Sequence, residues 1–286
     1  MITDPIRPML ITGSPRSGTT WVGRMVNFSP RVFYISEFFS PEKGKHFGIG
    51  RGNFKNWFVY INHENGYLYH QKVKNAIEMK YDFFYKILHV RAFNDLQWIL
   101  GECGNIAKTY FARGATLFKD PFAIFSAEWL AGIFNMNVLI LIRHPAAFVS
   151  SMKRMNWKFD FNNFLDQPLL MKNLLNDFEN EINDCAKGKL DFMTQTAILW
   201  KIIYSIVLKY KSDHSDWLFL KHEDISREPI KKFKLIYKNF GLNFSRKITE
   251  KIKEYTSEKN PIEAAGNETF FLKRNSKKIY TFGKTD

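Results

Sequence analysis

The sequence of 286 residues has only two cysteines, Cys103 and Cys185. Two cysteines are too few for a disulfide framework, and their spacing fits no metal site. Long hydrophobic runs are also missing, because the longest one, residues 197–208, contains Lys201 and is too short to span a bilayer. The first eight residues hold charges and two prolines where a secretory signal would be apolar. We therefore expect a soluble, cytoplasmic protein with no transmembrane segment.

Acidic residues are scarce relative to basic ones: 28 Asp and Glu stand against 42 Lys and Arg, which gives a formal net charge of +14 at pH 7. Such a surplus favours polyanions, whether nucleic acid, anionic lipid, acidic glycan or a multiply charged nucleotide, or it simply keeps a surface solvated. The net charge alone does not indicate which of these partners applies, or whether any does. The 28 phenylalanines are spread over the whole chain, which is typical of core filling.

Five short apolar runs predict five strands, and stretches between them predict helices. Near-continuous hydrophobic runs that are separated by helical crossovers are typical of buried parallel strands. The pattern therefore predicts an α/β fold with one central parallel sheet flanked by helices. The expected strands are Met9–Thr12, Val32–Ile35, Thr116–Phe118, Val138–Ile142 and Trp217–Leu220, and the expected helices are Thr19–Asn27, Val73–Leu100, Ala123–Phe134, Ala146–Met155, Leu169–Ala186, Thr194–Tyr210 and Pro229–Phe240.

Glycine, cations and carboxylates follow these strands. Open α/β sheets bind ligands beyond the carboxyl ends of their strands, so a single site built from separate segments is the simplest interpretation. The residues concerned are Gly13–Thr20 after the first strand, Glu37 after the second, Lys119 and Asp120 after the third, Arg143 after the fourth, and Lys221, Glu223 and Asp224 after the fifth.

Residues 13–20, which we call the phosphate loop, lie between a predicted strand and a predicted helix. Their spacing, two glycines separated by four residues and followed by two threonines, is close to that of a nucleoside-triphosphate loop. Backbone N–H groups of such a turn point at an anion, and the helix N-terminus adds positive charge. Thr19 stands where a triphosphate loop has Lys, and the cation is Arg16 instead. The loop thus suits a terminal 5'-phosphate group.

The string Ser14, Pro15, Arg16, Ser17, Gly18, Thr19, Thr20 and Trp21 resembles the 5'-phosphosulfate loop of the sulfotransferases that use 3'-phosphoadenosine-5'-phosphosulfate (PAPS). The resemblance implies a P-loop-like three-layer domain with PAPS as donor, 3'-phosphoadenosine-5'-phosphate (PAP) as product, and no metal. Arg143 and Ser151 resemble the family's 3'-phosphate pair, an Arg and a Ser eight residues apart. Arg274 and Lys277, in a basic C-terminal segment, would close over the 3'-phosphate or form a solvated tail.

The resemblance also implies catalytic residues. Glu37 lies where tyrosylprotein sulfotransferases carry a catalytic Glu, which makes it the candidate base, and Arg16 would stabilise the bridging oxygen. Residues 119–122 resemble a segment of the same subfamily. Lys119 either contacts the sulfuryl group or pairs with Asp120. A His base, as in cytosolic small-molecule sulfotransferases, is not supported.

The resemblance covers residues 9–40, 116–155 and 200–242 of one expected domain, 1–286. Residues 41–115 match nothing and are interpreted as a mostly helical insert that binds the acceptor, a hydroxyl or an amine. A carbohydrate is the first expectation, and a peptide tyrosine or a lipid headgroup is the alternative. Trp200 and Tyr204 lie on one helix face and are interpreted as core, with adenine stacking as the other possibility.

Two other functions are compatible with parts of the pattern. A P-loop kinase would need Lys after the second glycine and an Asp for Mg²⁺, for which Asp120 is the one weak candidate. A polyanion or nucleic-acid module would need basic residues beside exposed aromatics, for which residues 53–60 give a hint. We favour the sulfotransferase and expect no nucleic-acid partner.

Overall fold

The computed structural model describes residues 6–41, 54–80, 93–257 and 259–260. The two basic residues expected to close over the nucleotide, Arg274 and Lys277, lie outside this range, as do residues 42–53 and 81–92 of the expected insert.

Five strands form one parallel sheet in the order β2-β3-β1-β4-β5. Each predicted apolar run lies on one of them, so the predicted sheet is confirmed. Every residue of β1 and β3 is buried, as expected for the inner strands of a parallel sheet. The strands are β1 (Met9–Gly13), β2 (Val32–Ser36), β3 (Ala115–Lys119), β4 (Asn137–Ile142) and β5 (Leu218–Lys221).

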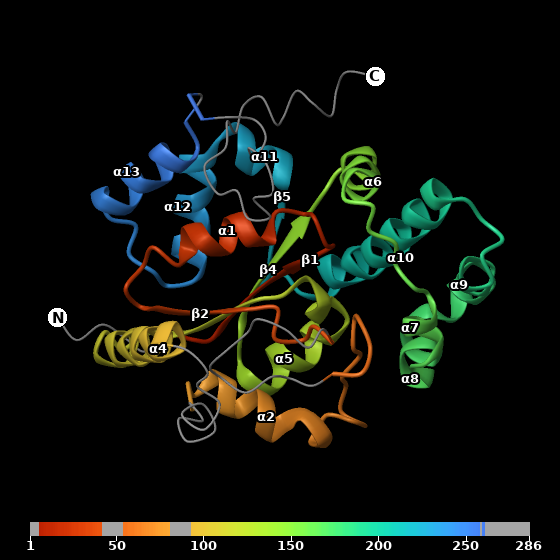
Figure 1. Cartoon of the computed structure of the whole chain (residues 1–286), viewed down its shortest axis with the longest axis horizontal. Coiled ribbons are helices and arrows are strands. Elements are labelled where there is room, and N and C mark those ends of the chain that lie inside the picture. Colours follow the sequence, from red (N-terminus) through yellow and green to blue (C-terminus); the bar gives the residue numbers. More distant parts are fainter. Residues whose placement is uncertain (1–5, 42–53, 81–92, 258, 261–286) are drawn as a thin grey trace.

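Helices cover both faces of the sheet (Figure 1). The longer ones are α1 (Thr19–Val26), α2 (Tyr67–Ile77), α4 (Phe93–Phe111), α5 (Ala127–Phe134), α6 (Pro145–Arg154), α9 (Glu179–Ala186), α10 (Phe192–Asp213), α12 (Pro229–Asn239) and α13 (Arg246–Tyr255). The shorter ones are α7 (Asn162–Leu165), α8 (Pro168–Leu170) and α11 (His222–Arg227), with 3-10 turns η1 (Pro121–Ser126) and η3 (Asn176–Phe178) and a π turn η2 (Met171–Leu175).

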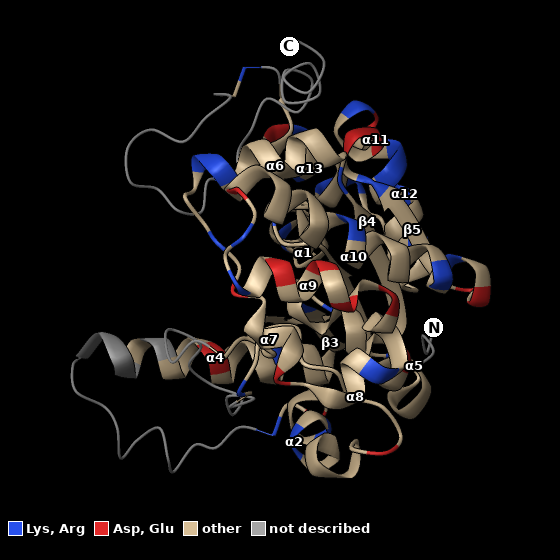
Figure 2. Ribbon diagram, turned by 90° about the vertical axis from the view of Figure 1, so that its right-hand side faces the viewer, with Lys and Arg blue, Asp and Glu red and all other residues tan. Residues whose placement is uncertain are grey.

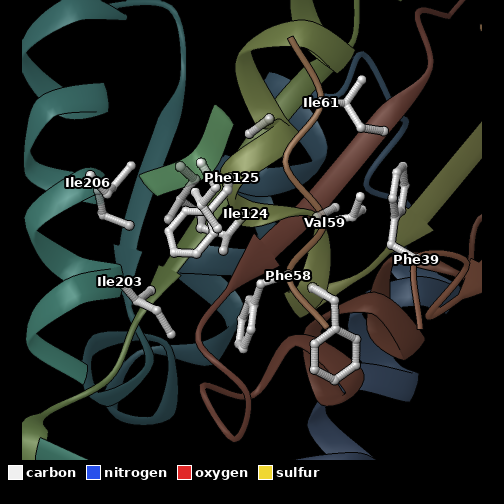
Figure 3. Close-up of a cluster of buried hydrophobic side chains, with 14 of the residues drawn as sticks. Phe39, Phe58, Val59, Ile61, Ile124, Phe125, Ile203 and Ile206 are labelled. Atoms are coloured by element: carbon white, nitrogen blue, oxygen red, sulfur yellow. The ribbon is translucent and has the colours of Figure 1, made fainter. Parts of the chain in front are cut away.

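Alternate residues of each strand enter two separate cores. Leu10 and Ile140 pack with α5, α6, α10 and residues 54–61, whereas Ile11 and Leu141 pack with α1, α12 and α13. Figure 3 shows part of the first core, in which Ile124 and Phe125 of η1 lie between Ile203 and Ile206 of α10 on one side and Val59 on the other. Two cores on opposite faces make the three layers that the sequence predicts.

Several predicted boundaries are wrong. The helix expected over residues 73–100 is interrupted, because α2 ends at Ile77 and Met79 takes a left-handed conformation with φ 54°. The helix expected from Ala123 starts as the 3-10 turn η1 at Pro121 and becomes α-helical at Ala127. The segment expected as one helix over 169–186 contains η2 and η3 before α9. Helices α7, α11 and α13 were not predicted.

None of the helices in the described part of the chain has both the length and the apolar composition that crossing a membrane requires.

Candidate active site

The phosphate loop leaves β1 and enters α1 at the carboxyl end of the sheet. Gly13 and Gly18 have φ values of 145° and 93°. A Cβ atom at Gly13 would lie 2.4 Å from the carbonyl oxygen of Leu141, and one at Gly18 would lie 2.3 Å from His222 Nδ1. Both positions therefore require glycine. No side chain caps the N-terminus of α1, and its first turn has no acidic residue, so its N–H groups can face an anion.

The loop meets the second expected anion site directly. Arg16 Nε donates a hydrogen bond of 3.0 Å to Oγ of Ser151, which lies on α6. Arg16 takes a left-handed φ of 63°, an uncommon conformation for a residue with a side chain. The loop after β1 and the helix after β4 thus bring their polar side chains to one place, as neighbouring strands β1 and β4 allow.

Three arginines come together at this end of the sheet. Burial of the guanidinium, and then the positive charge of Arg154, lower the pKa of Arg16. Burial also lowers the pKa of Arg143, where the positive charges of Arg16 and Arg154 act in the same direction and the Glu223 carboxylate opposes them. That carboxylate lies 3.6 Å from Arg143 Nε. Three arginines so close together make this end of the sheet positive, which suits a polyanion.

Helix α10 ties the two anion sites together through Tyr204 and Trp200. The Tyr204 hydroxyl lies 2.9 Å from Ser14 Oγ and accepts a 2.8 Å hydrogen bond from the backbone N–H of Arg143. Trp200 Nε1 donates to the carbonyl oxygen of Arg143 at 2.9 Å. Burial raises the pKa of Tyr204 to about 12, so this hydroxyl stays protonated near neutral pH. Tyr204 is a core residue as expected, but its polar atom also links the loop to the end of β4.

Buried polar atoms around the loop fit a nucleotide that carries phosphate groups. Ser17 Oγ and Arg143 Nε are buried and have no hydrogen-bond partner among the described residues. Buried donors of this kind are normally paired, and phosphate oxygens are suitable acceptors for both a hydroxyl and a guanidinium. The remaining loop residues are mostly packed: Pro15 and Thr19 are buried, Thr20 is half-buried, and Trp21 packs edge-on against His222 and Phe233.

Glu37, the expected base, lies at the end of β2 beside the loop. Its carboxylate forms an ion pair with Lys119 Nζ, whose side chain is fully buried, while 30% of the Glu37 side chain is exposed. The Glu37 backbone N–H donates to the Lys119 carbonyl oxygen at 2.8 Å. The charge of Glu37 also acts on the pKa of Arg16, which places the carboxylate near the loop cation.

Asp120 does not pair with Lys119, so the expected alternative pairing is wrong. The Asp120 carboxylate is fully buried and accepts backbone N–H groups from Phe39 at 2.6 Å and Phe122 at 2.9 Å. Burial raises its pKa to about 7, and the Phe39 N–H opposes this rise.

The aromatic residues in the described part of 53–60 do not form an exposed stacking surface. Phe54 and Phe58 are buried, and Trp57 packs on Phe122 and Trp157. Figure 2 shows Lys and Arg on many elements, among them α6 and α12, rather than on one. The described residues of 53–60 therefore lack the exposed aromatic side chains that a nucleic-acid module would need beside its basic residues.

The sequence analysis placed Glu223 after a predicted strand and named Trp200 and Tyr204, but it did not predict that all three contact Arg143. It also gave no role to Arg154, whose charge acts on Arg16 and Arg143. Glu223 and Tyr204 contact Arg143, yet they follow it by 80 and 61 positions. Only the position of Glu223 after a predicted strand gave a signal that could have placed it here.

Comparisons with known proteins assign the family. The sequence profile described as the sulfotransferase family matches residues 8–246. Solved structures similar to this chain include the sulfotransferase domain from the curacin biosynthetic pathway, at 12% identity over 86% of this chain and 77% of that chain with a TM-score of 0.45. Another is mouse sulfotransferase SULT7A1 complexed with PAP, at 13% identity over 95% and 75% with a TM-score of 0.41. A comparison with curated proteins found no match. Because the profile spans most of the chain, this protein belongs to the sulfotransferase family.

Proposed function

We propose that this sulfotransferase takes the sulfuryl group from PAPS and places it on a hydroxyl or amine of an acceptor. The observation that carries the proposal is the hydrogen bond between Arg16 and Ser151, with Arg143 beside it. A loop suited to a 5'-phosphate and a pair suited to a 3'-phosphate adjoin each other, which supports a ligand that has phosphate groups at both positions.

Each anion site uses a different kind of donor. The phosphate loop offers backbone N–H groups and the N-terminus of α1, and Arg16 adds a charge at its centre. Arg143 and Ser151 offer a forked guanidinium and a hydroxyl. PAPS supplies the sulfuryl group, and its departure leaves negative charge on the 5'-phosphate. Arg16 and the loop amides would stabilise that charge, at about 3–4 kcal/mol per strong donor.

Glu37 is the residue that we propose to remove the acceptor proton. Its carboxylate is partly exposed, so an acceptor can reach it, and the buried Lys119 amine holds it in place. A positioned base accelerates a reaction about 10²–10⁴-fold. In this arrangement Lys119 orients the base, and contact with the sulfuryl group is the second role that we propose for it.

The acceptor that we favour is a carbohydrate bearing anionic groups, because the chain has a net charge of +14. Residues 41–115 stay our proposed acceptor-binding insert. Within its described part, α2 packs on the sheet through Val73 and Ala76, and the segment 54–61 passes close to η1, so the insert reaches the same side of the sheet as Asp120.

The proposal is tested by calorimetric titration with PAP, followed by transfer assays with labelled PAPS. The acceptor panel would contain an anionic glycan, its neutral counterpart, a tyrosine peptide and a lipid headgroup. We expect PAP to bind and the anionic glycan to be the preferred acceptor. Magnesium-dependent ATP binding without PAP affinity would support a kinase instead, and salt-sensitive DNA binding without PAP affinity would support a polyanion module.

A further inference from the structure

Asp120 is a fully buried carboxyl group that directly follows β3. Its surroundings include the buried rings of Phe39 and Phe122. An ionisable group in such a place costs free energy unless its oxygens accept hydrogen bonds. Because none of its surface is exposed, Asp120 has no direct access to an acceptor. Any role of Asp120 in the reaction must therefore act through the groups to which it is hydrogen-bonded.

The two carboxylate oxygens of Asp120 hold two different segments. Oδ1 accepts the N–H of Phe122 at 2.9 Å and so caps the start of η1. Oδ2 accepts the N–H of Phe39 at 2.6 Å, from the segment that follows β2. Capping η1 needs only the first of these bonds. The second bond connects β3 to the turn that carries Glu37.

That turn has an uncommon backbone conformation. Glu37 has a φ of 55°, in the left-handed region that residues with side chains rarely adopt, so surrounding contacts must hold it. The Glu37 N–H donates to the Lys119 carbonyl oxygen at 2.8 Å, and the Glu37 carboxylate pairs with Lys119 Nζ. Two residues later, the Phe39 N–H meets Asp120. Lys119 and Asp120, which are consecutive at the end of β3, therefore hold the turn at Glu37 and at Phe39 respectively.

We propose that Asp120 is a positioning residue for sulfuryl transfer: its Oδ2 atom fixes the turn at residues 37–39 and thereby aims the Glu37 carboxylate. This inference rests on the proposed role of Glu37 as the base. Nucleotide binding should not depend on Asp120, because its described hydrogen bonds go to backbone groups of Ile11, Phe39, Phe122 and Ala123, and none goes to the phosphate loop.

The test uses Asp120→Asn in the full chain. The amide has the shape of the carboxyl group but only one acceptor oxygen, so one of the two backbone N–H groups would face an NH₂ group. We expect kcat to fall about 10–100-fold, as for a partly displaced base, while the Kd for PAP and the KM for PAPS change less than about twofold. Asp120→Ser is the second variant, because a serine still caps η1 but is too short to hold Phe39 as well.

Thr116→Val is the matched control. Thr116 lies on β3, the strand that Asp120 follows; it is buried and donates a 2.8 Å hydrogen bond to the Ile77 carbonyl oxygen, away from Glu37. It should lose stability comparable to that of Asp120→Asn and keep kcat. A further readout is non-additivity: in a Glu37→Gln background, Asp120→Asn should lower kcat no further, since both act through one carboxylate.

The outcomes separate this inference from the proposed function. If the wild-type protein shows no PAPS-dependent transfer, the proposed function itself is wrong. If wild type is active and Glu37→Gln is impaired, an unchanged kcat in Asp120→Asn would overturn the positioning role alone. A full additional loss in the Glu37→Gln background, or failure of both Asp120 variants to fold while Thr116→Val folds, would show a merely structural residue and would also overturn it.

Discussion

Arg16 Nε lies 3.0 Å from Ser151 Oγ, so the loop after β1 and the helix after β4 are in direct contact. We propose that the two side chains bind different phosphate groups of one nucleotide. Binding would then replace this contact with bonds from each side chain to its own phosphate. A single adenosine with 5'- and 3'-phosphates can reach both sites only if they lie close together, and this contact brings them together.

Arg143→Gln should weaken PAP binding selectively. A hydrogen bond to a charged group contributes about 1.5–3 kcal/mol, so the Kd for PAP should rise roughly 10–100-fold. Adenosine 5'-phosphate lacks the group that Arg143 is assigned to hold, so its Kd should change by less than about threefold. Calorimetry with both ligands measures the difference. An equal loss for both would refute the assignment of Arg143 to the 3'-phosphate.

Glu37→Gln should remove turnover and spare binding. The amide keeps an acceptor for Lys119 but cannot take a proton, so we expect kcat to fall about 10²–10⁴-fold with an unchanged Kd for PAP. Single-turnover assays with labelled donor check this. Glu250→Gln, which removes an exposed partner of Arg246, is the control and should leave both quantities unchanged. Activity near that of wild type in Glu37→Gln would exclude Glu37 as the base.

Tyr204→Phe should affect stability and nucleotide binding together. Its hydroxyl holds both Ser14 and the Arg143 N–H, and leaving buried polar groups unpaired costs about 1–3 kcal/mol of the free energy of unfolding. Tyr237→Phe is the control, because that buried hydroxyl donates a 2.8 Å hydrogen bond to Met25, away from the loop. Both variants should lose stability in denaturant titrations, but only Tyr204→Phe should lose PAP affinity. Equal PAP affinities in the two variants would contradict the role of Tyr204.

Asp120 should make stability depend on pH. Its pKa is raised from the usual 3.8 to about 7, chiefly by burial, with the Glu37 charge raising it further and Lys119 lowering it. The folded state therefore binds the proton more tightly than the unfolded state does. This stabilising contribution is fully present below about pH 4 and is lost as the pH rises through 7.

Asp120→Asn removes this titration. The difference in the free energy of unfolding between wild type and variant should therefore shift against wild type by up to about 1.4 kcal/mol per pH unit across that window. Denaturant titrations at several pH values measure the difference. A difference that is independent of pH would show that the pKa of Asp120 is not raised.

The sheet and the phosphate loop could be predicted because both leave local signals. Buried parallel strands are short apolar runs, and Gly13 and Gly18 stand where only glycine fits. By contrast, the end of α2 carries no such signal, because the left-handed residue after it is Met79 and not a glycine or asparagine. Residues 73–80 therefore look like the start of a longer helix.

The contacts between segments could not be predicted in the same way. Glu37 reaches Lys119 because β2 and β3 pair in the register that places Ser36 opposite Lys119. The sequence alone does not set that register, and Asp120, the neighbour of Lys119 in the chain, was an equally reasonable partner. Tyr204 reaches Ser14 only because α10 packs against β4, a relationship that depends on the whole fold.

The most direct test of the account is a calorimetric comparison of PAP, adenosine 5'-phosphate and adenosine 3'-phosphate on the wild-type protein without added metal. If the loop and Arg143 hold one nucleotide at its two ends, PAP should bind at least about 100-fold more tightly than either monophosphate. Equal affinity for PAP and adenosine 5'-phosphate would contradict the account.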